Sequence, residues 1–400
     1  MTQNNKFGMF VHWGIYSLTE VQEQALARFQ IDRAKYENLV NQFNPVKYDP
    51  EQWVLLAKSA GMKYICFTTK HHDGFCMWDT QHTDYNIMNT PYGKDVLKML
   101  ADACRKHGML LSLYYSNPDW HHPYGYNPNS SHQWCCTQKD VIDTVTYREY
   151  IKNQITELLS NYGPIYTLFW DIPPKIEDPS LNKLARQLQP GIIINDRGWS
   201  QGDFSTPERE CHVFEDAPFT RMTEACNSVE QQSWGYRKAP DFYSIRHLTC
   251  SIDHFMSMGA SYLLNVGPSA EGEIPECYAE RIRLVGNWYN RMECCLEQAA
   301  HDPFDYESRA NKCIATRKNG KTYLHFYEGL LSTAVTLKKY PGLPKSVKLM
   351  NTGTLLENRI EYLPGFFDGK TGACVDKYLH ITGIPVDELS QEPIVLEIEW

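Results

Sequence analysis

One pattern recurs through the first two thirds of the chain: a helix-like stretch, a glycine, a short apolar run and then a polar or aromatic tip. It is clearest where the apolar runs 64–69, 109–115 and 166–170 follow Gly61, Gly108 and Gly163. A glycine just past a helix end adopts the left-handed conformation without steric penalty. Nearly continuous apolar strands need cover on both faces. The pattern therefore predicts parallel strands alternating with helices, which is an α/β fold.

Two α/β architectures fit such a pattern, a (β/α)8 barrel and an open doubly wound sheet. Polar and aromatic residues follow most of the predicted strands, and only a barrel brings all strand ends to one mouth. No GxGxxG or GxxxxGK[ST] stretch follows a strand, which counts against a nucleotide-binding fold. We predict a (β/α)8-like barrel as the catalytic domain, over residues 1–300.

After residue 300 the pattern changes to short strands separated by Gly and Pro. Asn319-Gly320 separates two apolar runs and predicts a hairpin with a type I′ turn. Further short apolar runs follow at 333–337, 347–350, 378–381 and 394–398. Such strands with little helix predict a C-terminal β-sandwich domain over 301–400.

Charge and cysteine usage limit the classes of partner and compartment. The formal net charge of −9 argues against a nucleic-acid or anionic-membrane partner. No apolar run reaches the roughly 18 residues of a transmembrane helix. The 13 cysteines form no CxxC pair and no regular spacing typical of disulfide frameworks or zinc sites. Residues 1–6 lead into the first apolar run without a signal region, so we expect a reduced, cytoplasmic protein.

The strand tips predict a mouth with a carboxylate at its centre, Asp171, which ends the run 166–170. Imidazoles, aromatic rings and hydrogen-bond donors follow the other strands: His12, His71, His72, Tyr114, Trp120, Asn195 and Arg197. Metal binding by His71-His72 is the main alternative. However, neighbouring strand residues point to opposite faces, and no HxH or HExxH pattern supports a chelate. We therefore expect no metal and no cofactor.

Recognition of a neutral sugar fits this mouth best. The chain is rich in aromatic residues, with 25 Tyr, 16 Phe and 10 Trp, and flat ring faces suit the C–H surfaces of sugars. No GxSxG elbow indicates a serine nucleophile. Glycoside cleavage needs a second carboxyl group across the scissile bond. The candidates that follow Arg197 are Glu208, Glu210, Glu215 and Glu224, with Asp203 and Asp216 less favoured.

Seven short stretches stand in a fixed order between residues 7 and 268. They are Phe7-Gly8-Met9-Phe10-Val11-His12-Trp13-Gly14, Lys70-His71-His72-Asp73-Gly74-Phe75, Tyr114-Tyr115-Ser116, Trp170-Asp171, Asn195-Asp196-Arg197, Ser233-Trp234-Gly235-Tyr236 and Leu263-Leu264-Asn265-Val266-Gly267-Pro268. Together they resemble the α-L-fucosidases of glycoside hydrolase family 29. That family is similar in architecture to the prediction above, a (β/α)8-like barrel followed by a β-sandwich.

The resemblance implies a role for individual residues. Asp171 would be the nucleophile of a retaining mechanism. Glu23 falls where the family has a sugar-binding acidic residue, although Gln24 replaces the usual tryptophan after it. The other residues that would bind or line the fucose pocket are His12, His71, His72, Tyr114, Trp170 and Arg197, and Trp120 is a further candidate at the mouth.

The acid/base residue stays open among the glutamates. Many members of the family carry Trp-Glu ahead of Ser-Trp-Gly-Tyr, and Glu224 stands at that spacing, but Thr223 replaces the tryptophan. Members specific for 1,3- and 1,4-linked fucose resemble this chain more closely and take a glutamate from the preceding loop. We place Glu215 first, because an apolar run and Asp216 would both raise the pKa of its carboxyl group. Glu224 comes second, followed by Glu208 or Glu210.

We therefore predict a retaining exo-glycosidase that removes terminal α-1,3- or α-1,4-linked L-fucose from Lewis-type glycans through a covalent fucosyl-aspartate. Its partner would be a fucosylated oligosaccharide or glycoconjugate, with no nucleic acid and no membrane. Three alternatives remain: a relaxed-specificity α-L-fucosidase, a catalytically inactive fucose-binding protein, and a retaining hydrolase for another sugar.

Overall fold

The computed structural model describes residues 5–125, 143–209, 218–364, 369, 371–372 and 375–400. A parallel seven-stranded sheet forms the first part of the chain, in the order β5-β4-β3-β2-β1-β7-β6. Its strands are β1 (Phe7–Val11), β2 (Tyr64–Lys70), β3 (Leu110–Ser116), β4 (Thr167–Asp171), β5 (Ile193–Ile194), β6 (Glu224–Ser228) and β7 (Ser261–Val266). The α/β class predicted from the sequence is confirmed.

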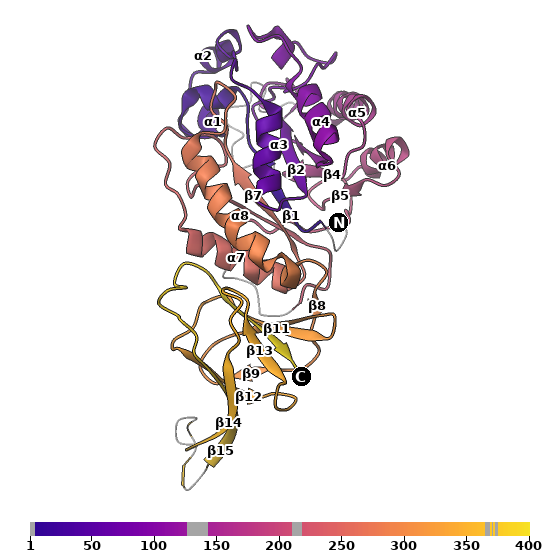
Figure 1. Ribbon diagram of the computed structural model, residues 1–400. Helices are drawn as coiled ribbons and strands as arrows, with labels where there is room; N and C mark the ends of the chain where they lie inside the picture. Colours follow the sequence, from indigo (N-terminus) through magenta and orange to yellow (C-terminus); the bar gives the residue numbers. More distant parts are fainter. Residues whose placement is uncertain (1–4, 126–142, 210–217, 365–368, 370, 373–374) are drawn as a thin grey trace.

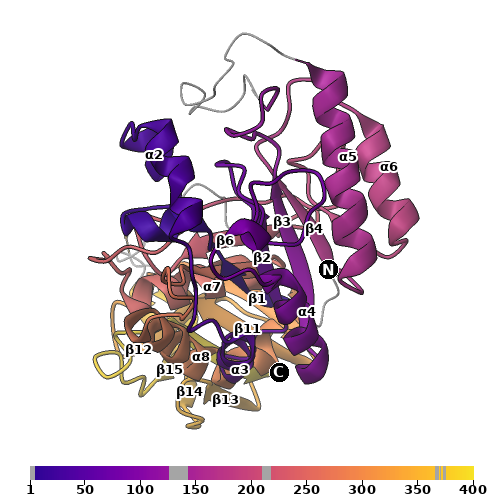
Figure 2. The same ribbon diagram turned by 90° about the horizontal axis from the view of Figure 1, so that it is seen from above.

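Helices surround this sheet on its outer side (Figures 1 and 2). The longer ones are α3 (Pro50–Ser59), α4 (Val96–His107), α5 (Thr144–Asn161), α6 (Pro179–Leu188), α7 (Ile245–Ser257) and α8 (Glu276–Leu296). The shorter ones are α1 (Ala25–Arg28), α2 (Arg33–Glu37) and the 3-10 turns η1 (Ile15–Thr19), η2 (Asn38–Asn41) and η3 (Ile87–Asn89). None of the helices in the described part of the chain has the length and apolar character needed to cross a membrane.

Local capping chemistry explains where these helices begin and end. Asp49, Asp95, Asp143 and Asp178 each precede a helix and accept hydrogen bonds from its first backbone N–H groups. At the other end of α4, Gly108 takes a φ of 65°, the left-handed conformation that the sequence pattern predicted. The chain then returns directly into β3.

The sheet is curled, so that strands far apart in its order meet inside it. Phe10 of β1 and Phe169 of β4 have ring centroids 5.4 Å apart, although two strands separate β1 from β4 in the sheet. The segment 204–208 lies between the two edge strands. It forms isolated parallel bridges from Phe204 to Asn195, just after β5, and from Glu208 to Cys226 of β6.

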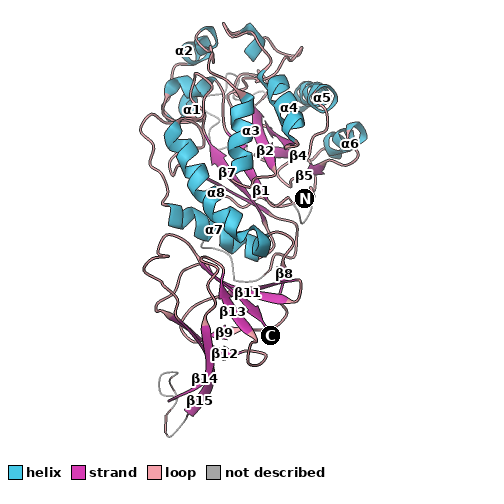
Figure 3. Cartoon of the chain, viewed as in Figure 1, coloured by secondary structure: helices cyan, strands magenta, loops and turns pink. Residues whose placement is uncertain are grey.

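The remainder of the chain forms two antiparallel sheets (Figure 3). One contains β8 (Ala300–His301), β10 (Ile314–Lys318), β11 (Lys321–Phe326), β13 (Ser346–Leu349) and β16 (Ile394–Glu399). The other contains β9 (Glu307–Ser308), β12 (Ala334–Lys339), β14 (Glu357–Pro364) and β15 (Val375–Thr382). The predicted hairpin joins β10 to β11, and Asn319 and Gly320 both have positive φ, as a type I′ turn requires.

The antiparallel sheets contact the first part of the chain through α7 and the end of α8. Asp253 Oδ1 of α7 lies 2.8 Å from His325 Nδ1 of β11, and both side chains are fully buried. Lys318 Nζ donates to Glu297 O, and Glu297 Oε1 in turn accepts from the backbone of Lys6, just before β1. The second part therefore adjoins the N-terminal end of β1, away from the C-terminal strand ends.

Candidate active site

Asp171 is the last residue of β4, and the side chains of Tyr114, Arg197 and His72 surround its carboxylate. Tyr114 Oη donates to Oδ2 at 2.7 Å, Arg197 Nη1 donates to Oδ1 at 3.1 Å, and His72 Nε2 lies 3.6 Å from Oδ2. Burial by itself raises the pKa of this carboxyl group. The nearby His72 ring, the charge of Arg197 and the Tyr114 hydrogen bond outweigh burial, so the pKa is lowered. Asp171 is therefore ionised, as a nucleophile must be.

Ile172, immediately after Asp171, has a φ of 57°. A β-branched residue in the left-handed region is strained, at a cost on the order of 1–3 kcal/mol. The Ile172 N–H donates to Asp171 Oδ1 at 2.9 Å, and Asn117 Nδ2 donates to the Ile172 carbonyl at 3.0 Å. The strained turn thus fixes the carboxylate at the end of the strand. Such outliers cluster at functional sites.

Three imidazole rings line the same end of the sheet. The ring of His71 lies 5.6 Å from that of His12, 4.2 Å from that of His72 and 5.6 Å from the stacked ring of Tyr114. Burial lowers the pKa of His12 to about 4 and also lowers that of His72. Both rings are therefore neutral near pH 7.

Hydrogen bonds on Nδ1 decide which nitrogen each neutral ring presents to a ligand. His12 Nδ1 lies 2.6 Å from Asn265 Oδ1, an acceptor, so that nitrogen carries the proton. His72 Nδ1 lies 2.7 Å from Ser116 Oγ, whose own proton goes to the Pro118 carbonyl. Each ring thus keeps Nε2 as an acceptor, a group that binds a sugar hydroxyl. Asn265 and Ser116 lie within the family-like stretches, although neither was predicted to act in the site.

Glu23 is buried and holds the loop 233–235. Its Oε2 accepts from Ser233 Oγ at 2.9 Å, Trp234 N at 2.9 Å and Gly235 N at 3.0 Å. Burial raises the pKa of Glu23. The Gly235 hydrogen bond and the nearby His12 lower it by more than burial raises it, so the pKa lies below its usual value. The Trp234 ring stacks on His12 at 5.3 Å. Through these contacts Glu23 supports the wall of the site beside His12.

A second carboxyl group, Glu208, shares Arg197 with Asp171. Arg197 Nη1 contacts both Asp171 Oδ1 and Glu208 Oε1, so the two carboxyl groups lie within a few ångströms of each other. The Glu208 side chain is 40% exposed. Partial burial and the negative charge of Asp171 nevertheless raise its pKa, against the opposing effect of Arg197. One ionised carboxylate and one carboxyl group of raised pKa thus face each other at the strand ends.

The placement of Glu208 changes the predicted ranking of the glutamates. Glu215, ranked first, and Glu210 lie outside the described residues. Glu224 is the first residue of β6, at the N-terminal end of the sheet, where the Tyr64 hydroxyl donates to it. Burial raises the pKa of Glu224 to about 7, but the residue lies at the opposite end from Asp171. The structure therefore does not place Glu224 beside Asp171, where an acid/base residue has to lie.

Trp170 also differs from its prediction. Side chains alternate along a strand, so Trp170 points away from the face that carries Asp171. Its Nε1 donates to Asn182 Oδ1 of α6 at 3.0 Å, and its ring packs edge-on against Tyr115. Trp120 is fully buried beside His72, with ring centroids 5.5 Å apart. Trp170 belongs to the outer core, and Trp120 supports His72.

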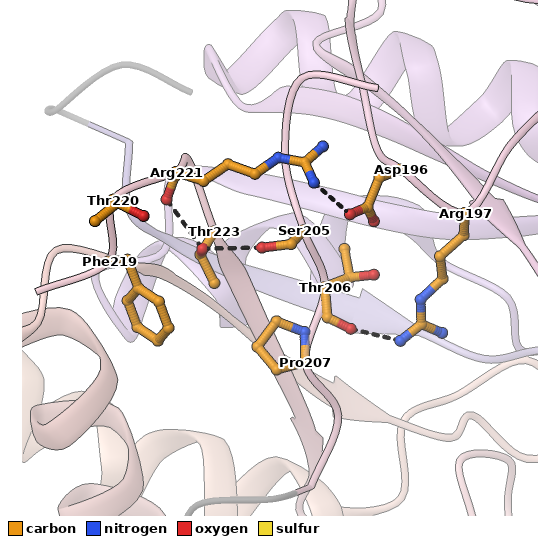
Figure 4. Close-up of a pocket in the computed structure, with 9 residues that line it drawn as sticks. All are labelled: Asp196, Arg197, Ser205, Thr206, Pro207, Phe219, Thr220, Arg221 and Thr223. Atoms are coloured by element: carbon orange, nitrogen blue, oxygen red, sulfur yellow. Dashed lines mark hydrogen bonds and ion pairs between the residues drawn. The ribbon is translucent and has the colours of Figure 1, made fainter. Parts of the chain in front are cut away.

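An open hollow of about 460 Å³ borders Arg197 (Figure 4). Arg221 Nη1 pairs with Asp196 Oδ2 at 2.8 Å, and Ser205 Oγ lies 3.0 Å from Thr223 Oγ1. The figure shows these contacts around the segment 204–208, with Arg197 donating to the Thr206 carbonyl. They tie that segment to its neighbours on both sides. Among the described residues, no group of His, Cys, Asp or Glu is arranged to hold a metal ion.

Comparison with known proteins gives one consistent family. The alpha-L-fucosidase family model matches residues 2–293. Tissue alpha-L-fucosidase of Mus musculus is 27% identical over 387 residues, covering 87% of this chain and 82% of that protein. The structure of alpha-L-fucosidase isoenzyme 1 from Paenibacillus thiaminolyticus is 30% identical, with a TM-score of 0.83, and covers 99% of this chain and 97% of its own. The alpha-L-fucosidase AlfC in complex with Fuca(1,6)GlcNAc is 31% identical, with a TM-score of 0.66, over 73% of this chain and 98% of its own.

Proposed function

This chain belongs to the alpha-L-fucosidase family and is a glycoside hydrolase of that activity, and we propose that it acts by a retaining mechanism with Asp171 as the nucleophile. The observation that carries the proposal is the pair of carboxyl groups on Arg197. Asp171 is held ionised, and Glu208 has a raised pKa. These are the two states that a nucleophile and an acid need. Family membership also sets aside the alternative of an inactive fucose-binding protein.

The reaction proceeds in two displacements. Asp171 attacks the anomeric carbon while the bond to the leaving oxygen breaks, and Glu208 gives that oxygen its proton. A fucosyl ester of Asp171 forms. Water then attacks the same carbon, Glu208 takes its proton, and the aspartate leaves. The separation of carboxyl groups in retaining enzymes, about 5–5.5 Å, is compatible with two groups that contact one guanidinium nitrogen.

The neutral histidines supply recognition of the sugar. His12 and His72 each offer Nε2 as an acceptor, and the Tyr114 and Phe10 rings below them give an apolar floor. A fucose ring places hydroxyls on one side and apolar C–H groups on others, so such a mixed pocket suits it. His12, His71 and His72 are therefore proposed to bind the hydroxyls, with Tyr114 and Arg197 around the reacting carbon.

Retention has a direct test. Proton NMR of the first product should show the α-anomer of fucose before it mutarotates, because two inversions at one carbon restore the configuration. First appearance of the β-anomer would mean a single displacement by water and would contradict the role given to Asp171. The measurement needs only the wild-type enzyme and an aryl α-L-fucoside.

We also propose that the curled sheet and the segment 204–208 together form a (β/α)8-like barrel, followed by a β-sandwich in 301–400. The parallel bridges on both sides of that segment support the first statement. For the second, side chains from both antiparallel sheets share one buried cluster, which includes Leu324 and Leu396 of one sheet and Leu337 and Leu379 of the other.

The proposed substrate is a branched, Lewis-type glycan with α-1,3- or α-1,4-linked fucose. Gln24, where relaxed-specificity members have a tryptophan, supports this linkage. The complex of the relative AlfC with Fuca(1,6)GlcNAc makes the α-1,6 linkage a second candidate. Contacts to the remaining sugars raise kcat/KM when they are present in the transition state, and they raise kcat as well when they are stronger there than in the bound substrate.

Initial rates on a Lewis trisaccharide, 2′-fucosyllactose and Fucα(1,6)GlcNAc decide between these linkages. We expect kcat/KM to be higher on the Lewis trisaccharide by roughly tenfold or more, since specificity contacts contribute that much. Equal rates on all three would indicate relaxed specificity. A preference for the 1,2- or 1,6-linked sugar would contradict the proposed linkage and leave the fucosidase activity untouched.

A further inference from the structure

A buried ion pair lies directly behind the histidines of the site. Lys70 is the last residue of β2, and Asp119 lies in the loop after β3. Lys70 Nζ and Asp119 Oδ2 are 3.0 Å apart, and their side chains are 0% and 1% exposed. Burying two charges is so costly that an apolar pair of similar size is often equally stable. Stability alone therefore does not account for this pair.

The lysine cation is enclosed by tyrosines. Lys70 Nζ donates to Tyr115 Oη at 3.0 Å and lies 4.3 Å from the centre of that ring. The rings of Tyr150 and Tyr147 stand 5.2 and 5.8 Å away. Ring faces attract a cation, and more strongly where water is excluded. The ammonium group is thus held in one place, and so is the carboxylate bound to it.

Asp119 in turn fixes two loops at the mouth. Its Oδ1 accepts from the backbone of His121 at 3.0 Å and of His122 at 2.8 Å. The loops after β2 and β3 close tightly around it. A Cβ on Gly74 would lie 2.2 Å from Asp119 Oδ1, and a Cβ on Gly125 would lie 2.1 Å from the Asp119 carbonyl oxygen. Only glycine leaves the necessary room at either position.

A short chain of contacts leads from this pair to the proposed nucleophile. Trp120 N, next to Asp119, donates to the His72 carbonyl at 2.8 Å, and the two rings lie 5.5 Å apart. His72 Nε2 lies 3.6 Å from Asp171 Oδ2. The backbone of His72 is therefore held from both sides, by Lys70 two positions before it and by the loop that Asp119 anchors.

From this geometry we propose that the Lys70–Asp119 pair is a positioning element of the active site, which holds His72 in place beside Asp171. The proposal rests on the role given above to Asp171. Neither Lys70 nor Asp119 touches the reacting atoms. They act through His72, and a displacement of a site residue by about 1 Å costs on the order of 10²-fold in rate.

The charge of Lys70 also bears on the ionisation of His72. The titratable groups that face this imidazole are Asp171, Glu23, Lys70, His12 and His71. Burial lowers the pKa of His72, the two carboxylates raise it, and Lys70 lowers it. Without the lysine charge, His72 should take up a proton at higher pH. An imidazolium beside Asp171 would pair with the carboxylate and weaken its attack.

The test compares Lys70→Met with Lys6→Met. Lys6 is also buried, at 5% exposure, but lies just before β1 at the other end of the sheet. For Lys70→Met we expect kcat/KM on an aryl α-L-fucoside to fall about 10- to 100-fold, mainly through kcat. NMR of the labelled imidazole should show His72 titrating at higher pH. Lys6→Met should leave kcat/KM and the titration of His72 unchanged, even if it lowers the melting temperature.

Asp119→Asn is the second variant, in case Lys70→Met does not fold. The amide keeps an acceptor for the His121 and His122 N–H groups and removes the charge. We expect a fall in kcat/KM of the same order, without a rise in the pKa of His72. If the variant that folds lowers only the melting temperature and matches Lys6→Met in kcat/KM, the proposal is overturned.

Asp171→Ala separates this inference from the proposed function. Full activity of that variant would show that Asp171 is not the nucleophile. A positioning role that acts on Asp171 would then have no basis. Loss of activity in Asp171→Ala, combined with wild-type kcat/KM in both Lys70→Met and Asp119→Asn, would reject only the positioning role.

Discussion

Replacing Asp171 with alanine is expected to lower turnover of an aryl α-L-fucoside by about 10³-fold or more, as for other covalent nucleophiles. The reason lies in the surroundings of the carboxylate. Tyr114, His72 and Arg197 hold it ionised at the strand end, and the strained turn at Ile172 fixes its direction. Among the described carboxylates at this end, Glu23 also has a lowered pKa but binds the backbone of the loop 233–235, and Glu208 has a raised pKa.

The measurement is release of 4-nitrophenol, with Asp171→Asn beside Asp171→Ala. Asparagine keeps the shape of the side chain, so retained fucose binding in that variant would show an intact pocket. Asp305→Ala, an exposed aspartate in the second part of the chain, is the control for loss of a carboxylate. Near wild-type turnover in both Asp171 variants would make the retaining mechanism proposed here untenable.

Much of the parallel sheet follows from local chemistry. Gly61, Gly108, Gly163 and Gly259 all have positive φ, and a strand follows each of them. These positions could be predicted because the need for glycine is set by a helix end a few residues away. The Asn319-Gly320 hairpin was predictable for the same reason, since its turn needs two residues with positive φ.

The closing segment 204–208 could not be predicted in this way. Its bridges to Asn195 and Cys226 are isolated, and β5 contains only two residues. Their pairing depends on the curl of the whole sheet rather than on the apolar pattern of the segment. Local periodicity carries no signal for such a contact.

In the candidate site, too, features set by local sequence could be predicted and contacts set by the tertiary fold could not. Asp171 and the histidines could be singled out from the sequence because each follows an apolar run at a strand end, and the structure brings them together. The resemblance implied that Trp170 lines the pocket, whereas the alternation of side chains along β4 directs it to the face opposite Asp171. Glu224 was ranked by its spacing from Ser233, and spacing does not tell which end of β6 a residue occupies. Glu208 was ranked low because its contact with Arg197 depends on how the long connection between β5 and β6 folds back on itself.

Glu208→Ala is expected to lose about 10²- to 10⁴-fold on substrates whose leaving group needs a proton, the range of general acid catalysis. An activated leaving group, such as 2,4-dinitrophenol, needs less help and should lose less in the first step. The second step then lacks its base, so the fucosyl-enzyme should accumulate. Added azide needs no general base, and it should restore the rate and yield a fucosyl azide.

The pH dependence of kcat/KM gives an independent test of Glu208 as the acid. In the wild type, kcat/KM should fall as Glu208 loses its proton, and its raised pKa moves this limb above the usual glutamate range. The limb should vanish in Glu208→Gln, which cannot titrate. Glu224→Gln should keep the limb, because Glu224 lies at the other end of the sheet with Tyr64.

Glu215→Ala is the decisive comparison, since the sequence favoured that residue. If Glu208 is the acid/base, Glu215→Ala should keep the basic limb and gain nothing from azide. Rescue of Glu215→Ala with no rescue of Glu208→Ala would transfer the role to the earlier candidate. Glu208 would then, together with Arg197, set the pKa of Asp171. Replacing Glu208 should in that case shift the acidic limb of the kcat/KM profile, where Asp171 titrates, instead of the basic limb. The two limbs therefore tell apart an acid that protonates the leaving oxygen from a carboxylate that only tunes the nucleophile.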